Sequence, residues 1–325
     1  MQLNQETIIN QDLKENIVIE EIKVFAPATV ANVGCAFDIL GFALENIGDE
    51  MIFRKTSTPG IKIISKGLGN LPTNPEKNVA GVVAIEMMKN EDSSFGLEIE
   101  INKKINPGSG IGSSAASASG AAFGISKLLN RNYSTHELIH FAMQGEKLAS
   151  GAEHADNVAP AITGEFALIR GYHPLDMIVI KAPKNLYCTV IHPQIEIKTK
   201  EAREMLPKEV ALKDAVIQWG NVAGLIAGLH QSNYQLIGRS LQDIIIEPQR
   251  AKLIPGFYNL KMAAMDSGAL GCSISGSGPS VFALSEGIET ANAIKAAFDK
   301  VYFDKGIDYH LFVSAIGKTG SRLIQ

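Results

Sequence analysis

The sequence contains little cysteine. Cys35, Cys188 and Cys272 stand far apart in a chain of 325 residues, and their number is odd. A scattered, odd set fits a reduced cytosolic protein better than a disulfide framework, so we expect a cytoplasmic location. The first residues lack the apolar stretch of a secretory signal, and no apolar run is long enough to span a bilayer. We therefore expect no membrane partner.

The chain also lacks an excess of positive charge. Its formal net charge is −4 at pH 7 and it has no basic block, which argues against a nucleic-acid-binding surface. An anionic ligand must then be held by a few local cations and dipoles rather than by the field of the whole protein. With 46% hydrophobic and 20% charged residues, the chain is expected to bury a sizeable core, and its length suggests about two domains.

Strand and helix signals are mixed along the chain, with little change in composition. Apolar alternation predicts strands near residues 21–25, 61–65, 97–101, 178–180, 188–191 and 309–316, and a pair of short strands within 270–284. Helices are predicted near residues 78–89, 115–129, 134–149, 212–231, 233–245 and 287–302. We expect a polar extension over residues 1–20, an N-terminal domain over 21–175 and a C-terminal domain over 176–325.

The most informative motif is PGSGIGSSAA, from Pro107 to Ala116. A Walker A loop would need a lysine after its last glycine, but Ser113 follows Gly112 and the loop contains no lysine. The glycine spacing also differs from that of a dinucleotide fingerprint, and a flexible linker would not turn directly into a helix. Glycines that bring backbone N–H groups close to a ligand, followed by the positive end of a helix, predict a cradle for phosphate.

The helix predicted at 134–149 contains the pattern HExxH, which is typical of zinc proteases. His136 and His140 fall on the side of the helix that also carries Lys147, which we expect to face solvent. Glu137 is the acid that a capping box with Ser134 requires. We therefore interpret the pattern as a chance match rather than a zinc site.

Glu146 falls inside the apolar stripe of the same helix. A carboxylate there is costly unless it is paired or bound to a metal, although the helix end could also let it reach solvent. Ser114, in the glycine-rich segment, would supply a second oxygen ligand. Magnesium takes one or two protein oxygens together with nucleotide phosphates, so the pair predicts a magnesium site.

Two further segments, residues 28–38 and 150–160, are interpreted as polar loops set among apolar residues. Asn157 precedes Val-Ala-Pro and is expected to point inward, whereas the first loop is weak evidence when taken alone. Arg203 and Arg250 are isolated arginines, and each taken singly fits a solvated surface position.

Taken together, these segments resemble the motifs of the GHMP kinase superfamily, and of its homoserine kinases in particular. The resemblance covers about residues 22–318. The three superfamily motifs are matched by residues 26–41, by Pro107–Ala116 and by Ser275–Ser280 (SGSGPS). The likeness to homoserine kinases rests on Gly145-Glu146, residues 150–160, Glu201–Arg203 and Glu247–Arg250. Asn106 and Ile111 depart mildly from the residues usual in the superfamily.

The resemblance implies an enzyme that phosphorylates the side-chain hydroxyl of L-homoserine with ATP and Mg²⁺, in threonine biosynthesis. It also implies an α+β fold of two domains, a ribosomal-S5-like N-terminal one and a ferredoxin-like C-terminal one, with the active site between them. A homodimer is plausible by the same resemblance. Another GHMP activity, on mevalonate or a sugar, stays open, and so does a ligand sensor without catalytic activity.

The resemblance also assigns roles to individual residues around the nucleotide. It places Asn78 near the adenine, and Ser114 and Glu146 on the magnesium ion. The triphosphate would be held by Pro107, Gly108, Ser109, Gly110, Ile111, Gly112, Ser113, Ser114 and Ala115.

On the substrate side, the resemblance implies that Asp38, beside Asn32, pairs with the amino group. Arg203 and Arg250 would hold the carboxylate, because the planar guanidinium group of arginine can form bidentate hydrogen bonds with a carboxylate.

His154 and Asn157 would orient the substrate hydroxyl. Asn157 stands where other members of the superfamily place an aspartate. An amide is no useful base, so we expect catalysis by Asn157, Ser114 and Glu146 without a side-chain base. Asp156 is the rival candidate for that base.

Overall fold

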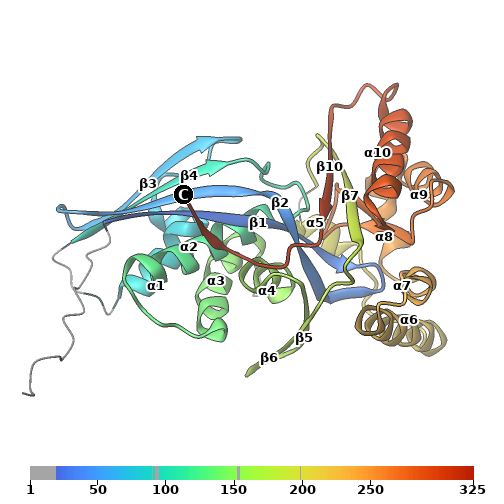
Figure 1. The fold of residues 1–325 in the computed structure, drawn as a ribbon, viewed down its shortest axis with the longest axis horizontal. Helices are drawn as coiled ribbons and strands as arrows, with labels where there is room; N and C mark the ends of the chain where they lie inside the picture. Colours follow the sequence, from blue (N-terminus) through green and yellow to red (C-terminus); the bar gives the residue numbers. More distant parts are fainter. Residues whose placement is uncertain (1–19, 90, 92–94, 152–153, 198) are drawn as a thin grey trace, which may run out of the picture.

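The computed structural model describes residues 20–89, 91, 95–151, 154–197 and 199–325. Its strands form two sheets, and Figure 1 shows the sheets side by side, each with its own helices. Nearly all of the polar extension predicted for residues 1–20 lies outside the described residues. No helix within the described ranges combines the length and the apolar character needed to cross a membrane.

The first sheet has seven strands. Its main path runs β11-β1-β2-β4-β3, and β5 pairs with β2 on one side and with β6 on the other. The strands are β1 (Glu21–Val33), β2 (Ala36–Thr56), β3 (Gly60–Gly67), β4 (Gly96–Lys103), β5 (Phe166–Tyr172), β6 (Leu175–Ile180) and β11 (Arg322–Ile324). The last strand therefore returns from the far end of the chain to pair with the first one.

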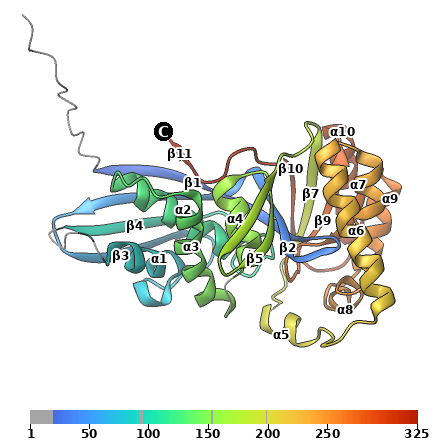
Figure 2. The same cartoon turned by 90° about the horizontal axis from the view of Figure 1, so that it is seen from below.

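Four helices cover one face of this sheet, as Figure 2 shows from below. They are α1 (Val79–Met88), α2 (Ser113–Leu128), α3 (Thr135–Ser150) and α4 (Ala155–Thr163). α2 packs close to the strands because its glycines leave room: a methyl group at Gly120 would meet Met51, and one at Gly124 would meet the ring of Phe53. The small-residue face of this helix thus brings the glycine-rich loop near the sheet.

The other face of the first sheet carries charged side chains. Along β4, Leu97, Ile99 and Ile101 are buried under the helices, and the alternate residues Glu98 and Glu100 face outward.

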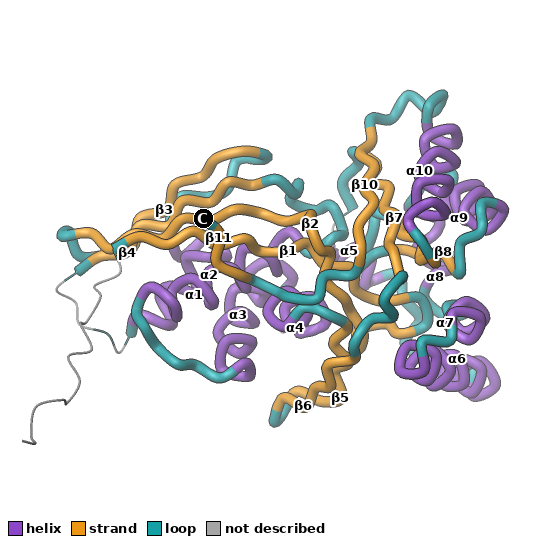
Figure 3. Tube along the Cα trace, in the orientation of Figure 1, coloured by secondary structure: helices purple, strands orange, loops and turns teal. Residues whose placement is uncertain are grey.

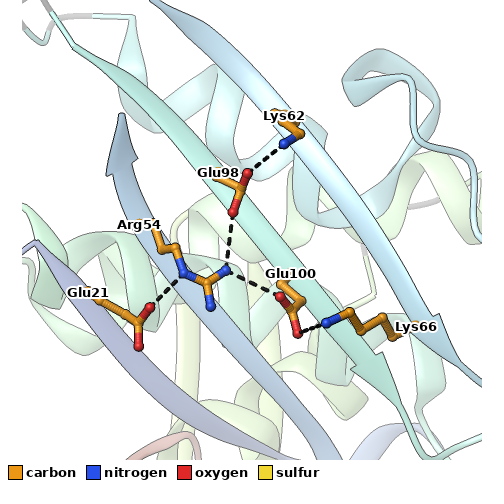
Figure 4. Close-up of polar contacts among 6 residues, drawn as sticks. All are labelled: Glu21, Arg54, Lys62, Lys66, Glu98 and Glu100. Atoms are coloured by element: carbon orange, nitrogen blue, oxygen red, sulfur yellow. Dashed lines mark hydrogen bonds and ion pairs between the residues drawn. The ribbon is translucent and has the colours of Figure 1, made fainter. Parts of the chain in front are cut away.

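Figure 4 shows that Arg54 lies between these two glutamates, at 3.1 and 3.2 Å from them, and also bonds Glu21 at 2.6 Å. Lys62 and Lys66 extend this network of ion pairs, with Lys62 bonded to Glu98 and Lys66 to Glu100. The hydrogen bonds from these lysines, and from Arg54, lower the pKa values of Glu98 and Glu100.

The second sheet has the order β10-β7-β9-β8, formed by β7 (Leu186–Pro193), β8 (Gly271–Ile274), β9 (Val281–Glu286) and β10 (Tyr309–Ala315). The tube in Figure 3 shows most of its helices, but not α5, gathered on the side away from the first sheet. The helices are α5 (Thr199–Glu204), α6 (Leu212–Gln231), α7 (Tyr234–Ser240), α8 (Glu247–Arg250), α9 (Phe257–Asp266) and α10 (Ile288–Tyr302). The chain changes sheets between β6 and β7, and the division predicted at residues 175/176 stays a prediction about separate domains.

Several predicted elements are confirmed, including the capping box between Ser134 and Glu137 that begins α3. His136 and His140 are both exposed, as predicted for a chance HExxH match.

Three predictions were wrong. Residues 155–163 form a helix rather than a loop, and residues 28–38 are the ends of two strands around a tight turn. The helix predicted to end at 245 ends at Ser240. The side chain of Asp243 instead accepts the N–H groups of residues 245–247 at the start of α8, so the chain begins a new helix there.

Candidate active site

A cavity of about 370 Å³ opens between the two halves of the molecule. Of the residues given a role from the sequence, only Ile111 and Ala115 do not line it; both are buried in the core. The lining contains Asn32, Asp38, Asn78, Pro107, Gly108, Ser109, Gly110, Gly112, Ser113, Ser114, Glu146, His154, Asn157, Arg203 and Arg250. Segments far apart in the chain thus meet at one place, although the roles of their residues stay proposals.

The glycines of the loop are required by its backbone. Gly108, Gly110 and Gly112 have φ values of 74°, 80° and 66°, a left-handed conformation that other residues rarely adopt. A methyl group at Gly112 would overlap Thr29 Oγ1, and one at Gly110 would press on the carbonyl of Gly278. At Gly108 it would meet open space, so this glycine borders the cavity itself.

The loop is fixed through its carbonyl groups. Ser280 Oγ donates to Ser109 O at 2.6 Å, and Ser275 Oγ donates to Gly110 O at 2.7 Å. The Thr29 N–H donates to Ile111 O at 3.2 Å. Because C=O and N–H point in opposite directions across a planar trans peptide, these bonds aim the next three N–H groups away from the protein contacts. Such a row of N–H groups at the start of a helix suits a phosphate.

Ser109 supports an anion site independently. Its Oγ atom is buried and has no hydrogen-bond partner among the residues that the structure describes, yet Ser109 lines the cavity. A buried hydroxyl without a partner costs about 1–3 kcal/mol, so a bound oxygen atom would relieve this cost.

Lys103 is a cation that we did not predict for this site. It lies in the inward register of β4, bonds Asp49, and donates to Ser113 O at 2.6 Å and Ser117 Oγ at 3.0 Å. Burial lowers the pKa of Lys103, while the carboxylate of Asp49 opposes this change. The sequence did contain a signal that Lys103 points inward: it continues the every-second-residue pattern of the buried residues Leu97, Ile99 and Ile101. It supplies positive charge beneath the first turn of α2.

Glu146 and Ser114 face the same part of the cavity from neighbouring helices. Glu146 is only 8% exposed, and this burial raises its pKa to about 7, although a hydrogen bond with Ser114 and the charge of Lys103 act in the opposite direction. A carboxyl group whose ionised form is so disfavoured gains from a nearby cation. Its donor set, a carboxylate and a hydroxyl, is of the kind that Mg²⁺ prefers, so the residues fit this ion. No cluster of three or more His, Cys, Asp or Glu side chains suited to a metal occurs in the part of the chain that the structure describes.

Asn157 and Asp156 lie in the first turn of α4. Thr29 Oγ1 donates to Asn157 Oδ1 at 2.7 Å, which leaves the amide –NH₂ of Asn157 as a donor toward the cavity. Asp156 is 3% exposed. Burial raises its pKa to about 7, and the nearby charge of Asp38 adds to the effect. Ala152 and Glu153, which precede this helix, lie outside the described residues.

Asp38, His154 and the two arginines form the polar end of the cavity. Arg203 Nη2 donates to both carboxylate oxygens of Asp38, at 3.0 and 2.8 Å, and lies 3.1 Å from His154 Nε2. Burial lowers the pKa of His154, and the charges of both arginines add to this while Asp38 opposes it. Arg250 was interpreted singly as a surface residue, and that was wrong, because it is 3% exposed. Burial lowers its pKa to about 10.

One carbonyl group joins two of these residues. Asn32 Nδ2 and Arg250 Nη1 both donate to Gly276 O, at 2.8 and 2.9 Å. Asn32 also accepts the N–H of Asp38 at 2.8 Å. The SGSGPS segment therefore holds the polar end of the cavity as well as the glycine loop.

Asn78 also lines the cavity and is buried. Its Oδ1 accepts the N–H groups of Ala80 and Gly81 at the start of α1, and its Nδ2 donates to Pro72 O at 2.7 Å. This side chain thus fixes the segment around Pro72, which also lines the cavity. Contact of Asn78 with adenine stays a prediction.

Comparisons with known proteins agree with the fold. Residues 78–165 match the family model of the GHMP kinase N-terminal domain, and residues 225–304 match that of the GHMP kinase C-terminal domain. The chain is 46% identical to homoserine kinases of Chlorobium phaeovibrioides and Chlorobium phaeobacteroides over 320 residues, 94% of this chain and all of each relative. The crystal structure of homoserine kinase from Cytophaga hutchinsonii superposes with a TM-score of 0.90 at 48% identity, covering 98% of this chain and 100% of that one. The chain therefore belongs to the homoserine kinases of the GHMP kinase family, and the predicted two-domain α+β fold is confirmed.

Proposed function

We propose that this phosphotransferase moves the terminal phosphoryl group of ATP to the side-chain hydroxyl of L-homoserine. The observation that carries the proposal is the single cavity that joins two unlike ends. One end has a loop of carbonyl-anchored glycines and the buried hydroxyl of Ser109. The other has Asp38 with Arg203 and Arg250. Phosphate suits the first end, and the charges of an amino acid suit the second.

The substrate's two charges match the second end. Asp38 would take the ammonium group, with Asn32 fixing its backbone, and Arg203 and Arg250 would share the carboxylate. Mevalonate has a carboxylate but no cation for Asp38, and a neutral sugar has neither. On binding, the ammonium group of a zwitterion would pair with Asp38 and its carboxylate with Arg203. These two contacts would take the place of the present bond between Arg203 and Asp38.

Ser114 and Glu146 would hold Mg²⁺ near the phosphates. When bound, the ion would offset negative charge on the transferred phosphoryl group. The loop N–H groups and the positive end of α2 act in the same direction, since phosphoryl transfer depends mainly on positioning and on charge stabilisation. Lys103 adds a buried positive charge behind them.

Proton removal from the hydroxyl distinguishes two mechanisms. In the one we favour, Asn157 donates to and orients the hydroxyl, its carbonyl oxygen is held by Thr29, and the proton leaves to a phosphate oxygen. In the rival mechanism, Asp156 accepts the proton. Asp156→Asn would keep near wild-type activity in the first case and lose about 10²-fold or more in the second.

The substrate assignment is tested by ADP release with L-homoserine, mevalonate and galactose, each without and with Mg²⁺. We expect turnover of L-homoserine alone, and only with the metal. Arg203→Ala should raise KM for L-homoserine and leave KM for ATP unchanged. Turnover of mevalonate or galactose in preference, or none at all, would refute the assignment.

We also propose a cytoplasmic location, from the scattered cysteines, and a homodimer, on the resemblance alone. Light scattering of the purified chain at micromolar concentration tests the dimer, and a monomeric mass would refute it.

A further inference from the structure

The ring of Phe37 lies against both arginines of the amino-acid end of the cavity. The ring centroid is 5.5 Å from Arg203 Cζ and 5.0 Å from Arg250 Cζ. Both distances fall within the range of about 6 Å over which an aromatic ring attracts a cation. One side chain therefore contacts both guanidinium groups.

The backbone explains how Phe37 and Asp38 both reach Arg203. Along a regular strand, neighbouring side chains point to opposite faces. Asp38 breaks this alternation because its φ is 61°, in the left-handed region, and Asn32 Oδ1 accepts its N–H at 2.8 Å. The ring and the adjacent carboxylate consequently contact the same guanidinium group.

The two arginines need such a contact. Arg250 is nearly inaccessible to water, and the charge of Arg203 adds to the effect of burial in lowering the pKa of Arg250. Arg203 stands on α5, a helix of six residues, which is too short to be stable alone. An aromatic face offsets part of the positive charge without using the N–H donors of either arginine. The donors that are not bonded to Asp38 or to the carbonyls of Ala202 and Gly276 stay available for a carboxylate.

We propose that Phe37 is a positioning residue, which holds the two guanidinium groups at the spacing at which one substrate carboxylate bridges them. This rests on the proposed function, in which the arginines bind that carboxylate. Phe37 therefore sets the affinity for the amino acid and not the affinity for ATP, whose loop lies at the other end of the cavity.

The experiment measures KM for L-homoserine and for ATP in Phe37→Leu, Phe37→Tyr and a series with stepwise fluorinated phenylalanine at position 37. Leucine keeps an apolar side chain but has no aromatic face, and fluorination weakens the attraction for a cation while the ring remains. We expect Phe37→Leu to raise KM for L-homoserine about tenfold. Phe37→Tyr should stay within about twofold of wild type, and KM should rise with each added fluorine. KM for ATP should not change.

Phe25→Leu is the matched control, because the ring of Phe25 stacks on Arg322, at 4.2 Å, outside the cavity. It should leave both KM values unchanged. A second readout needs no substrate: the ring current of Phe37 shifts the Nε–Hε NMR signals of Arg203 and Arg250, and Phe37→Leu should remove this shift while Phe25→Leu keeps it.

An unchanged KM for L-homoserine in Phe37→Leu, an equal rise in KM for ATP, or a fluorinated series without a trend would each overturn the inference. Absence of wild-type turnover of L-homoserine would instead refute the proposed function. The NMR shifts then still decide whether the ring holds the arginines.

Discussion

His192 on β7 ends a chain of hydrogen bonds that reaches the glycine loop. Gln194 Nε2 donates to His192 Nδ1 at 3.0 Å, and Asn106 Nδ2 donates to Gln194 Oε1 at 2.6 Å. The carbonyl of Asn106 accepts the N–H of Ser109 at 3.2 Å within the loop. Since Nδ1 accepts in this chain, protonation of His192 would break it.

Acid should therefore destabilise the protein through His192. Burial, with a further contribution from His310, lowers the pKa of His192 from 6.5 to about 4. Between these values the unfolded chain binds a proton that the folded chain does not, so stability is lost as the pH falls. The expected loss of unfolding free energy is about 2 kcal/mol by pH 5 and about 3 kcal/mol by pH 4.

Urea unfolding of wild type and His192→Gln at pH 7, 5 and 4 tests this. Glutamine still offers an oxygen to Gln194 but does not titrate, so wild type should lose about 3 kcal/mol more than the variant between pH 7 and pH 4. His310→Gln is the matched control; His310 is exposed, and this variant should keep most of the acid-dependent loss. Identical pH dependence in wild type and His192→Gln would refute the reasoning.

Three further predictions follow from the site and the sheet. Gly112→Ala should lower the unfolding free energy well beyond the loss of about 1–2 kcal/mol expected for Gly108→Ala, because only the first methyl group overlaps Thr29; equal losses in urea unfolding would count against the loop geometry. Glu146→Gln should weaken the Mg²⁺-dependent gain in ADP affinity about tenfold or more, and calorimetry showing the full gain would remove Glu146 from the metal site. Arg54→Met should cost about 1 kcal/mol at low ionic strength and less in 1 M salt; a loss independent of salt would contradict a role through its ion pairs.

Sequence signals that act within a few residues predicted their elements well. The Ser134–Glu137 capping box begins α3, and alternation along residues 97–101 marks β4. The start of α4 was missed because Asp156 and Asn157 were taken as loop residues, although short polar side chains are also favoured at helix starts. Local patterns could not choose between the two, since the contacts of α4 with α2, β1 and β2 come from distant segments.

The burial of Arg250 shows why single polar residues are harder to place. Its hydrogen bonds go to the carbonyls of Ala202 and Gly276, which lie on other segments of the chain. Lys103 is similar, because its partner Asp49 is 54 residues away. A local sequence pattern cannot identify partners that lie so far along the chain. Arg250 was therefore assigned to the candidate site from the resemblance to a family and not from periodicity.

The SGSGPS segment explains how the two ends of the cavity keep a fixed spacing. Ser275 Oγ donates to the carbonyl of Gly110 in the glycine loop, and the carbonyl of the next residue, Gly276, accepts from Asn32 and Arg250. The Gly276 N–H donates to Ala31 O at 3.0 Å, which ties the same residue to β1. Two consecutive residues thus contact the glycine loop and the polar end of the cavity at once. In-line transfer needs donor and acceptor aligned closely, and under the proposed function a segment bonded to both ends would help to supply that alignment.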